Sequence, residues 1–159
     1  SKLLFYILSG KKIGIIGAKE KVSLIQTLMT YDEYKTNMSI KEIYEYININ
    51  QIGAGGDYLK TLAIIDEQIT LEADVYLVGI GISKLYVLPE LKDKYGKVFI
   101  DVGAGIDALA GIIPNTRSYF ANWTNYRLRK YDYSNVDILS YQKDVKNKIE
   151  NIKYLDEKW

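Results

Sequence analysis

The sequence predicts an α/β domain with an open parallel sheet flanked by helices. Three compact apolar runs rich in β-branched residues predict buried strands, at residues 12–18, 74–79 and 97–102. Amphipathic segments separate them, and strands buried on both faces with helical connections are typical of a parallel sheet. We therefore expect these three strands to lie parallel in one sheet.

The helices are predicted from apolar spacing and from start and stop signals. Four segments are predicted to be helical. They are residues 2–8, 19–29 and 83–95, and residues 106–111, where a further helix begins. Asp57 is expected to cap one more, which runs to about residue 70. Pro89 lies within the segment 83–95 and predicts a kink or a late start there. Alternation of these helices with the strands indicates a Rossmann-like arrangement.

Other segments give weaker signals. Residues 40–49 match a helix as well as a strand, and their β-branched and tyrosine content favours a strand over the second half. Residues 53–56 (GAGG) are interpreted as a loop before a helix rather than a phosphate site. Residues 115–133 are polar and aromatic without a clear period, whereas residues 140–155 resume a helical period. We expect one domain over residues 1–159, with residues 134–159 as a C-terminal helical extension.

Composition excludes several kinds of function. Histidine and cysteine are absent, so Ser-His-Asp, Cys-His and thiol chemistry are excluded, and a zinc site is disfavoured. A bound metal would be a hard cation such as Mg²⁺ or Mn²⁺, held by oxygen atoms. The net charge of +1 gives no basic excess for nucleic acid. No apolar run reaches the ~18 residues of a membrane span, and no signal-peptide pattern is present, so we expect a cytoplasmic protein.

The first candidate site is the turn Gly79–Lys84, where a strand leads into a helix. Such a turn presents free backbone N–H groups and the positive end of the helix dipole, and both favour a phosphate. Gly79 and Gly81 would let a ligand approach the backbone. Ser83 could cap the helix or bond a ligand oxygen, and Lys84 could add positive charge. A purely structural turn remains the alternative, because the pattern is only G-x-G.

The second candidate site follows the next strand. Asp101 and Asp107 flank Gly103 and Gly105 at the carboxyl end of that strand, which in an open parallel sheet is where ligands bind. A carboxylate there needs a partner, a helix cap or a metal ion. The structural alternative is that Asp107 caps the helix that begins at Ala108, and that Asp101 bonds nearby backbone.

A third group of residues follows this edge in the sequence. Arg117 could pair with a phosphate or carboxylate. The remaining members are interpreted as a C-terminal segment that packs over the sheet with solvated arginines. They are Thr116, Tyr119, Trp123, Arg127 and Arg129.

The segment from Asp74 to Gly111 resembles the core of the GT-D-type glycosyltransferases, bacterial proteins of surface-polysaccharide and adhesin glycosylation. In that family a strand ends in a glycine-containing loop before a helix, and the next strand ends in a D-[IV]-G motif with a further Asp. The matching positions are Gly79–Ser83, Asp101-Val102-Gly103 and Asp107, followed by Thr116-Arg117. The run KKIGIIGAKEK matches the preceding strand, so the resemblance covers residues 10–120.

The resemblance implies a UDP-sugar donor, a bacterial glycan or glycoprotein acceptor, and a divalent cation, Mn²⁺ or Mg²⁺. The donor diphosphate would lie on the turn Gly79–Lys84, near Gly103 and Arg117, and Asp101 or Asp107 would hold the cation. Asp107 is also the candidate base for the acceptor hydroxyl. The oligomeric state is left open.

The sequence departs from the family pattern in two places. A D-x-E metal motif would fall at Asp107, where this chain reads Asp107-Ala108-Leu109, and the family's Arg-x-Gly-Asp-Gly-Glu segment is missing. We expect either a domain of a longer protein or a shortened, inactive relative. The alternative function is a non-catalytic Rossmann-like module that binds a nucleotide or a partner protein. A methyltransferase-like domain is less favoured, because Glu42 and Glu45 are poor candidates for binding a ribose.

Overall fold

The computed structural model describes residues 6, 8–50, 57–112 and 127–133. The chain divides into two compact units, Ser1–Leu128 and Arg129–Trp159. The first unit carries the predicted α/β fold. In the second unit residues 129–133 are described, and the rings of Tyr131 and Tyr133 pack edge to face with centroids 4.9 Å apart. The predicted extension at residues 134–159 lies outside the described residues.

The described elements of the first unit alternate between strands and helices, with one short 3₁₀ turn, η1. In chain order they are β1 (Ile13–Ala18), α2 (Lys19–Leu28), α3 (Asp32–Met38), β2 (Ile43–Ile49), α4 (Tyr58–Gln68), β3 (Val75–Gly79), η1 (Gly81–Ser83), α5 (Lys84–Tyr95), β4 (Val98–Asp101) and α6 (Gly105–Leu109).

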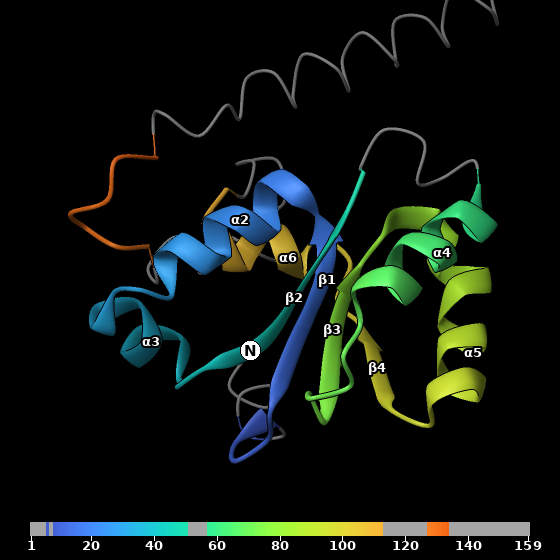
Figure 1. Ribbon diagram of the computed structural model, residues 1–159. Coiled ribbons are helices and arrows are strands. Elements are labelled where there is room, and N and C mark those ends of the chain that lie inside the picture. The colour runs from blue at the N-terminus through green and yellow to red at the C-terminus, as the bar shows by residue number, and fades with distance from the viewer. Residues whose placement is uncertain (1–5, 7, 51–56, 113–126, 134–159) are drawn as a thin grey trace, which may run out of the picture. The chain divides into compact units, whose positions relative to one another are not determined.

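The four strands form one sheet in the order β2-β1-β3-β4, and each neighbouring pair is parallel. The predicted parallel arrangement of β1, β3 and β4 is therefore confirmed. Figure 1 shows α2 and α6 on one face of the sheet, and α4 and α5 on the other. Strand β2 lies on one side of β1, and the next strand in the sequence, β3, lies on the other side of β1. The carboxyl ends of β1 and β3 are thus the point at which the strand order reverses.

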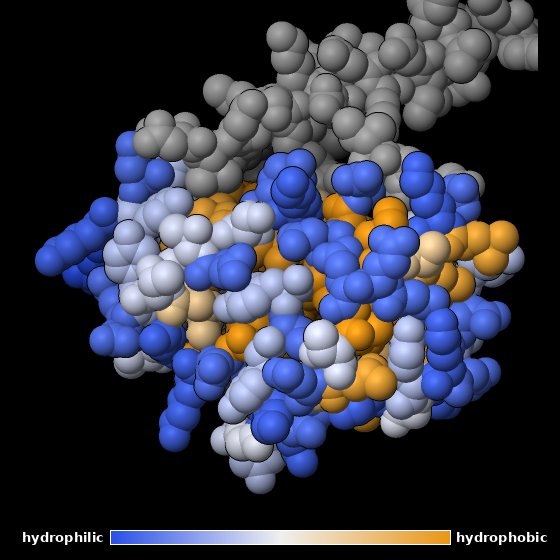
Figure 2. Space-filling view, viewed as in Figure 1, coloured by the Kyte–Doolittle hydropathy of each residue, from blue (hydrophilic) through white to orange (hydrophobic). Residues whose placement is uncertain are grey.

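A hydrophobic core lies between the sheet and the pair α4 and α5. Ile16 of β1, Ile47 of β2 and Val78 of β3 pack there against Ile65 of α4 and Leu91 of α5, and all five are buried. Figure 2 shows a mostly polar outer surface, with orange apolar side chains over the strands and at the right, where α4 and α5 lie. Among the described residues, no helix has the length and apolar character needed to cross a membrane.

Most sequence-based boundaries agree with the structure. Asp57 caps α4 as predicted, and its Oδ1 accepts a hydrogen bond from the Lys60 N–H at 3.0 Å. The segment 40–49 is a strand, which begins at Ile43. Pro89 lies inside α5, which begins at Lys84, so the predicted late start does not occur. Of the predicted helix at residues 2–8, Tyr6 and Leu8 are described, and both are helical.

Two features of the fold differ from the sequence-based expectation. Helix α3 was not predicted, because its heptapeptide is mostly polar and only Tyr34 and Met38, four residues apart, are buried. Strand β4 was predicted to be buried, but it forms an edge of the sheet and Val98 is 54% exposed. An apolar run of this length does not reveal whether a strand is central or at an edge.

A row of side chains crosses the sheet on the α4–α5 face. Glu45 and Tyr76 lie on either side of Gly14, and Tyr76 stacks on Phe99 of β4 with ring centroids 4.9 Å apart. A Cβ at Gly14 would lie 2.5 Å from Tyr76 Cδ1. Because Gly14 has no side chain, the Tyr76 ring can cross over it. The Tyr76 hydroxyl then donates a hydrogen bond to Glu45 Oε1 at 2.7 Å.

Candidate functional site

The two predicted loops lie side by side at the carboxyl ends of β3 and β4. Val102 N–H donates to the Val78 carbonyl oxygen at 3.0 Å, which extends the pairing of the strands into the second loop. The Gly103 carbonyl oxygen lies 2.7 Å from the point where a Cβ at Gly79 would be. The first loop continues through η1 into the twelve-residue helix α5. The structure therefore brings together the two segments that the sequence proposed as a ligand site.

Asp101 joins the two loops. Its Oδ1 accepts a hydrogen bond from the Gly103 N–H at 2.9 Å, and its Oδ2 pairs with Lys84 Nζ at 2.5 Å. The side chains of Lys84 and Asp101 are 36% and 33% exposed. Because this ion pair is open to solvent, Lys84 can exchange its carboxylate for another anion without burying a charge.

The glycines of the two loops have different roles. Gly81 has φ +63° and Gly103 has φ +49°, so both adopt the left-handed backbone that glycine favours. A Cβ at Gly81 would meet no atom within 4 Å, and the space beside it is open. At Gly79, by contrast, a Cβ would lie 2.5 Å from Ile106 Cγ1. The space beside Gly79 is therefore taken up by protein.

Ser83 is the residue before α5. Its side chain makes no capping hydrogen bond, so the predicted cap is not formed. The residue is only 3% exposed, and its hydroxyl is buried with no hydrogen-bond partner. A buried hydroxyl without a partner is unfavourable by about 1–3 kcal/mol. This unpartnered group lies next to Lys84, at the N-terminus of a helix.

Asp107 lies inside α6 and does not cap a helix that begins at Ala108. Its carboxylate forms an ion pair with Lys21 in the first turn of α2, and both side chains are largely buried. Lys21 was not among the candidate residues predicted from the sequence. The available signal was its position just after β1, at the same edge of the sheet as the two loops.

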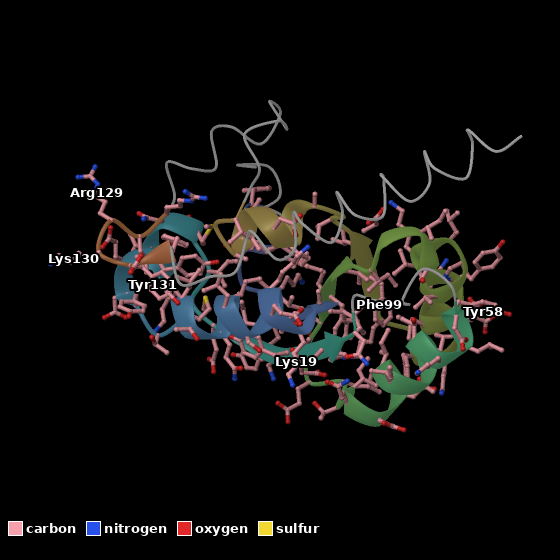
Figure 3. All side chains as sticks on the ribbon, turned by 90° about the horizontal axis from the view of Figure 1, so that it is seen from above. Lys19, Tyr58, Phe99, Arg129, Lys130 and Tyr131 are labelled. Atoms are coloured by element: carbon pink, nitrogen blue, oxygen red, sulfur yellow. The ribbon has the colours of Figure 1, made fainter. Side chains whose placement is uncertain are left out.

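Ile106 covers the point at which the strand order reverses. Its Cγ2 lies 3.2 Å from the Cβ position of Gly17 in β1, and its Cγ1 packs on Gly79 in β3. The Tyr34 hydroxyl of α3 donates a hydrogen bond to the Leu109 carbonyl oxygen at 2.6 Å, which links α3 to the end of α6. Figure 3 looks down on this edge, with α2 and α6 on one side and α4 and α5 on the other. As far as the described residues show, the open part of this edge is therefore at β3 and β4 rather than between β1 and β3.

The described side chains do not form a divalent-cation site as they lie. Asp101 and Asp107 are each paired with a lysine. No group of three or more His, Cys, Asp or Glu within the described ranges could hold a metal ion. Lys21 and Lys84 bring positive charge to the two carboxylates, and the cation implied by the resemblance stays a prediction.

The third group of candidate residues is described only in part. Thr116, Arg117, Tyr119 and Trp123 lie outside the described residues. The Arg127 Nε–H donates to the Gly111 carbonyl oxygen at 2.5 Å, just beyond the end of α6. Arg129 belongs to the second unit.

Comparison of the chain with models of protein families, with curated proteins and with solved structures finds no match.

Proposed function

We propose that the carboxyl ends of β3 and β4 bind the diphosphate of a nucleotide sugar, with UDP as the expected nucleotide. We propose further that the chain is a glycosyltransferase, or a domain of one, which passes the sugar to a bacterial glycan or glycoprotein in the cytoplasm. The observation that carries the binding site is the buried, unpartnered Ser83 hydroxyl beside Lys84, at the N-terminus of α5. The choice of a sugar donor rests on the resemblance to GT-D-type glycosyltransferases.

The groups at this edge suit a diphosphate. The turn η1 leads directly into α5, and the positive end of the helix dipole there favours an anion. Lys84 would turn from Asp101 to the phosphate oxygens, and Gly81 leaves open space where the ligand can meet the backbone. In a transfer reaction, the bond between the sugar and the diphosphate breaks and negative charge grows on the departing phosphate. Lys84 would stabilise that charge.

The base that takes the acceptor proton is proposed from the resemblance as Asp107. Its side chain is 9% exposed and paired with Lys21, so an acceptor hydroxyl would have to displace the lysine to reach it. Asp101 is the more exposed carboxylate at the edge. Substituting each aspartate by asparagine and measuring transfer would distinguish the two.

The binding site is tested by calorimetric titration with UDP and with UDP-glucose, each with and without Mn²⁺. We expect Lys84→Gln to lower affinity for UDP about tenfold, or ~1.4 kcal/mol. The matched control is Lys94→Gln, which removes an ion pair of the same 2.5 Å length, to Asp66, at the other end of α5. Equal affinity of the wild type and Lys84→Gln, or no binding of either ligand to the wild type, would contradict the proposal. Mn²⁺-dependent affinity would support the predicted cation.

The second candidate function is a non-catalytic nucleotide-binding or protein-interaction module. Two observations favour it: Ile106 covers the point of strand reversal, and a lysine neutralises each candidate carboxylate. Release of glucose from UDP-glucose in the presence of Mn²⁺ discriminates the two functions. Binding without release or transfer would favour the module.

A further inference from the structure

Strand β4 leaves an apolar edge open to solvent. It is the last of the described strands in the order β2-β1-β3-β4, and Val98 is 54% exposed. Val102 N–H donates to Val78 of β3, and successive residues of a parallel strand bond to opposite neighbours. The backbone groups of Phe99 therefore point outward, away from β3. Edges of this kind are normally shielded, because they can pair with another strand.

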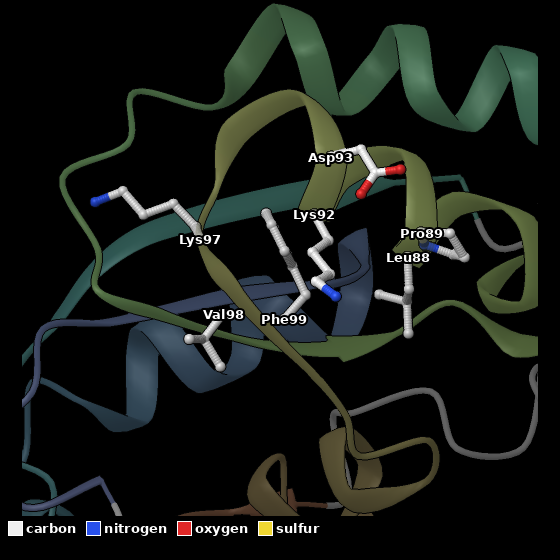
Figure 4. Close-up of a pocket in the computed structure, with 7 residues that line it drawn as sticks. All are labelled: Leu88, Pro89, Lys92, Asp93, Lys97, Val98 and Phe99. Carbon is white, nitrogen blue, oxygen red and sulfur yellow. The ribbon is translucent and has the colours of Figure 1, made fainter.

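A pocket of about 430 Å³ lies beside this edge, between β4 and α5. Leu88 and Pro89 of α5 and Phe99 of β4 give it an apolar wall. Its charged lining residues are Lys92, Asp93 and Lys97. Figure 4 shows Phe99 pointing from β4 toward Lys92, and Val98 pointing to the other side of the strand. The pocket is thus continuous with the open strand edge.

Among the described elements, the connections between parallel strands have one handedness, and none of these strands lies beyond β4. The connection through α2 leads from β1 to β2, and the connection through α5, on the opposite face, leads from β3 to β4. Helix α6 lies on the α2 face, where it packs against Gly17 and Lys21. A right-handed crossover through that face leads toward β2 and away from β4.

We propose that the open edge of β4 pairs with β4 of a second copy of this chain. The two strands would run antiparallel about a twofold axis at Phe99. The segment Lys97-Val98-Phe99-Ile100-Asp101 is self-complementary in this register. Lys97 would lie opposite Asp101 of the second copy, and Val98 opposite Ile100. Opposite charges and apolar side chains facing each other across strands stabilise such a pair.

The helices also fit this arrangement. Helix α5 packs over β4, and its Val87 and Leu91 belong to the core cluster that also contains Tyr76 and Val78 of β3. Two copies of α5 related across the seam would lie about two strand spacings apart, or ~10 Å. That is the usual distance between packed helices. The second α5 would close the apolar pocket and could bring an Asp93 to each Lys92. Contact through both the strands and the helices forms an isologous interface, in which one patch meets itself.

Sedimentation equilibrium of the full chain tests the proposal. We expect the wild type to reach the mass of a dimer with rising concentration, and Val98→Lys to stay a monomer with an unchanged circular dichroism spectrum. Leu59→Lys on α4 is the matched control, because Leu59 is 63% exposed and does not belong to the β4 edge. We expect it to dimerise like the wild type.

A second variant, Lys97→Asp, places like charges opposite each other while leaving the apolar residues intact. We expect it to weaken the dimer at least tenfold, and less so at high salt, because salt screens the repulsion. A monomeric wild type at all concentrations would overturn the proposal. So would dimers of undiminished affinity in both edge variants. UDP binding is measured separately, so either proposal can fail without the other.

Discussion

At the scale of single residues, Glu45 is the most constrained charged group of the sheet. The residue is 6% exposed, and its carboxylate accepts hydrogen bonds from the N–H groups of Thr70 at 3.0 Å and Ala73 at 2.8 Å, besides the Tyr76 hydroxyl. Burial raises the pKa of Glu45, but these hydrogen bonds outweigh it and the net shift is downward. Burial and the neighbouring Glu45 raise the pKa of Tyr76, so its hydroxyl remains a donor. The carboxylate thus joins β2 to β3 across β1.

Replacing Glu45 by glutamine tests this role. The amide would offer donors where the carboxylate accepts them, and we expect Glu45→Gln to lower the free energy of unfolding at pH 7 by about 1–3 kcal/mol. The folded-state pKa of Glu45 is lowered, so its stabilisation is present above the unfolded value of 4.5. It is lost as the pH falls through the folded pKa. The difference between variant and wild type should therefore shrink with acidification.

Urea unfolding measured between pH 7 and pH 3 gives these free energies. Glu42→Gln is the control, since Glu42 lies just before β2 and outside this hydrogen-bonded row. A Glu45→Gln variant as stable as the wild type at pH 7, or a difference that does not change with pH, would contradict the assigned role.

At the scale of elements, the packing of α6 on β3 depends on Gly79. We expect Gly79→Ala to destabilise the fold by about 1–3 kcal/mol, because its Cβ would crowd Ile106 and the Gly103 carbonyl oxygen. At Gly81 a Cβ would meet no other atom. We therefore expect Gly81→Ala to lower the free energy of unfolding only by the cost of a positive φ for alanine, about 1–2 kcal/mol. The affinity for UDP per folded molecule should fall in Gly81→Ala, because its methyl group enters the proposed ligand space.

Chemical denaturation and calorimetry of the two variants check this prediction. Unperturbed stability in Gly79→Ala would show that α6 does not pack on β3 as described. Unperturbed UDP affinity in Gly81→Ala would place the ligand elsewhere.

The same elements show how far sequence reasoning reaches. The apolar, β-branched runs of β1 and β3 predict strands because both are buried in the middle of the sheet. In the segment of β2, the apolar residues Ile40, Ile43, Tyr44 and Ile47 also fit a helical period, so the pattern alone was ambiguous. Helix α3 escaped prediction because two buried residues are too few to define a period. The edge position of β4 depends on strand order, which the local sequence does not encode.

At the scale of the whole molecule, the position of the two loops could be predicted, but their contacts could not. Parallel strands bring their carboxyl ends to one edge, so the turn at Gly81 and the loop at Gly103 were expected there. The pairing of Lys84 with Asp101 and of Lys21 with Asp107 depends on how α5 and α6 lie against the strands. The contact between Ile106 and Gly17 depends on the same packing.

We have proposed that the carboxyl ends of β3 and β4 are the ligand site. Amide chemical shifts of the isotope-labelled full chain, recorded during a titration with UDP, test this proposal. We expect the largest shift changes at Gly81, Ser83, Lys84 and Gly103. Lys12 and Asp74, which are hydrogen-bonded to each other just before β1 and β3, should remain unchanged. Shift changes confined to other residues, or none at a large excess of UDP, would contradict it.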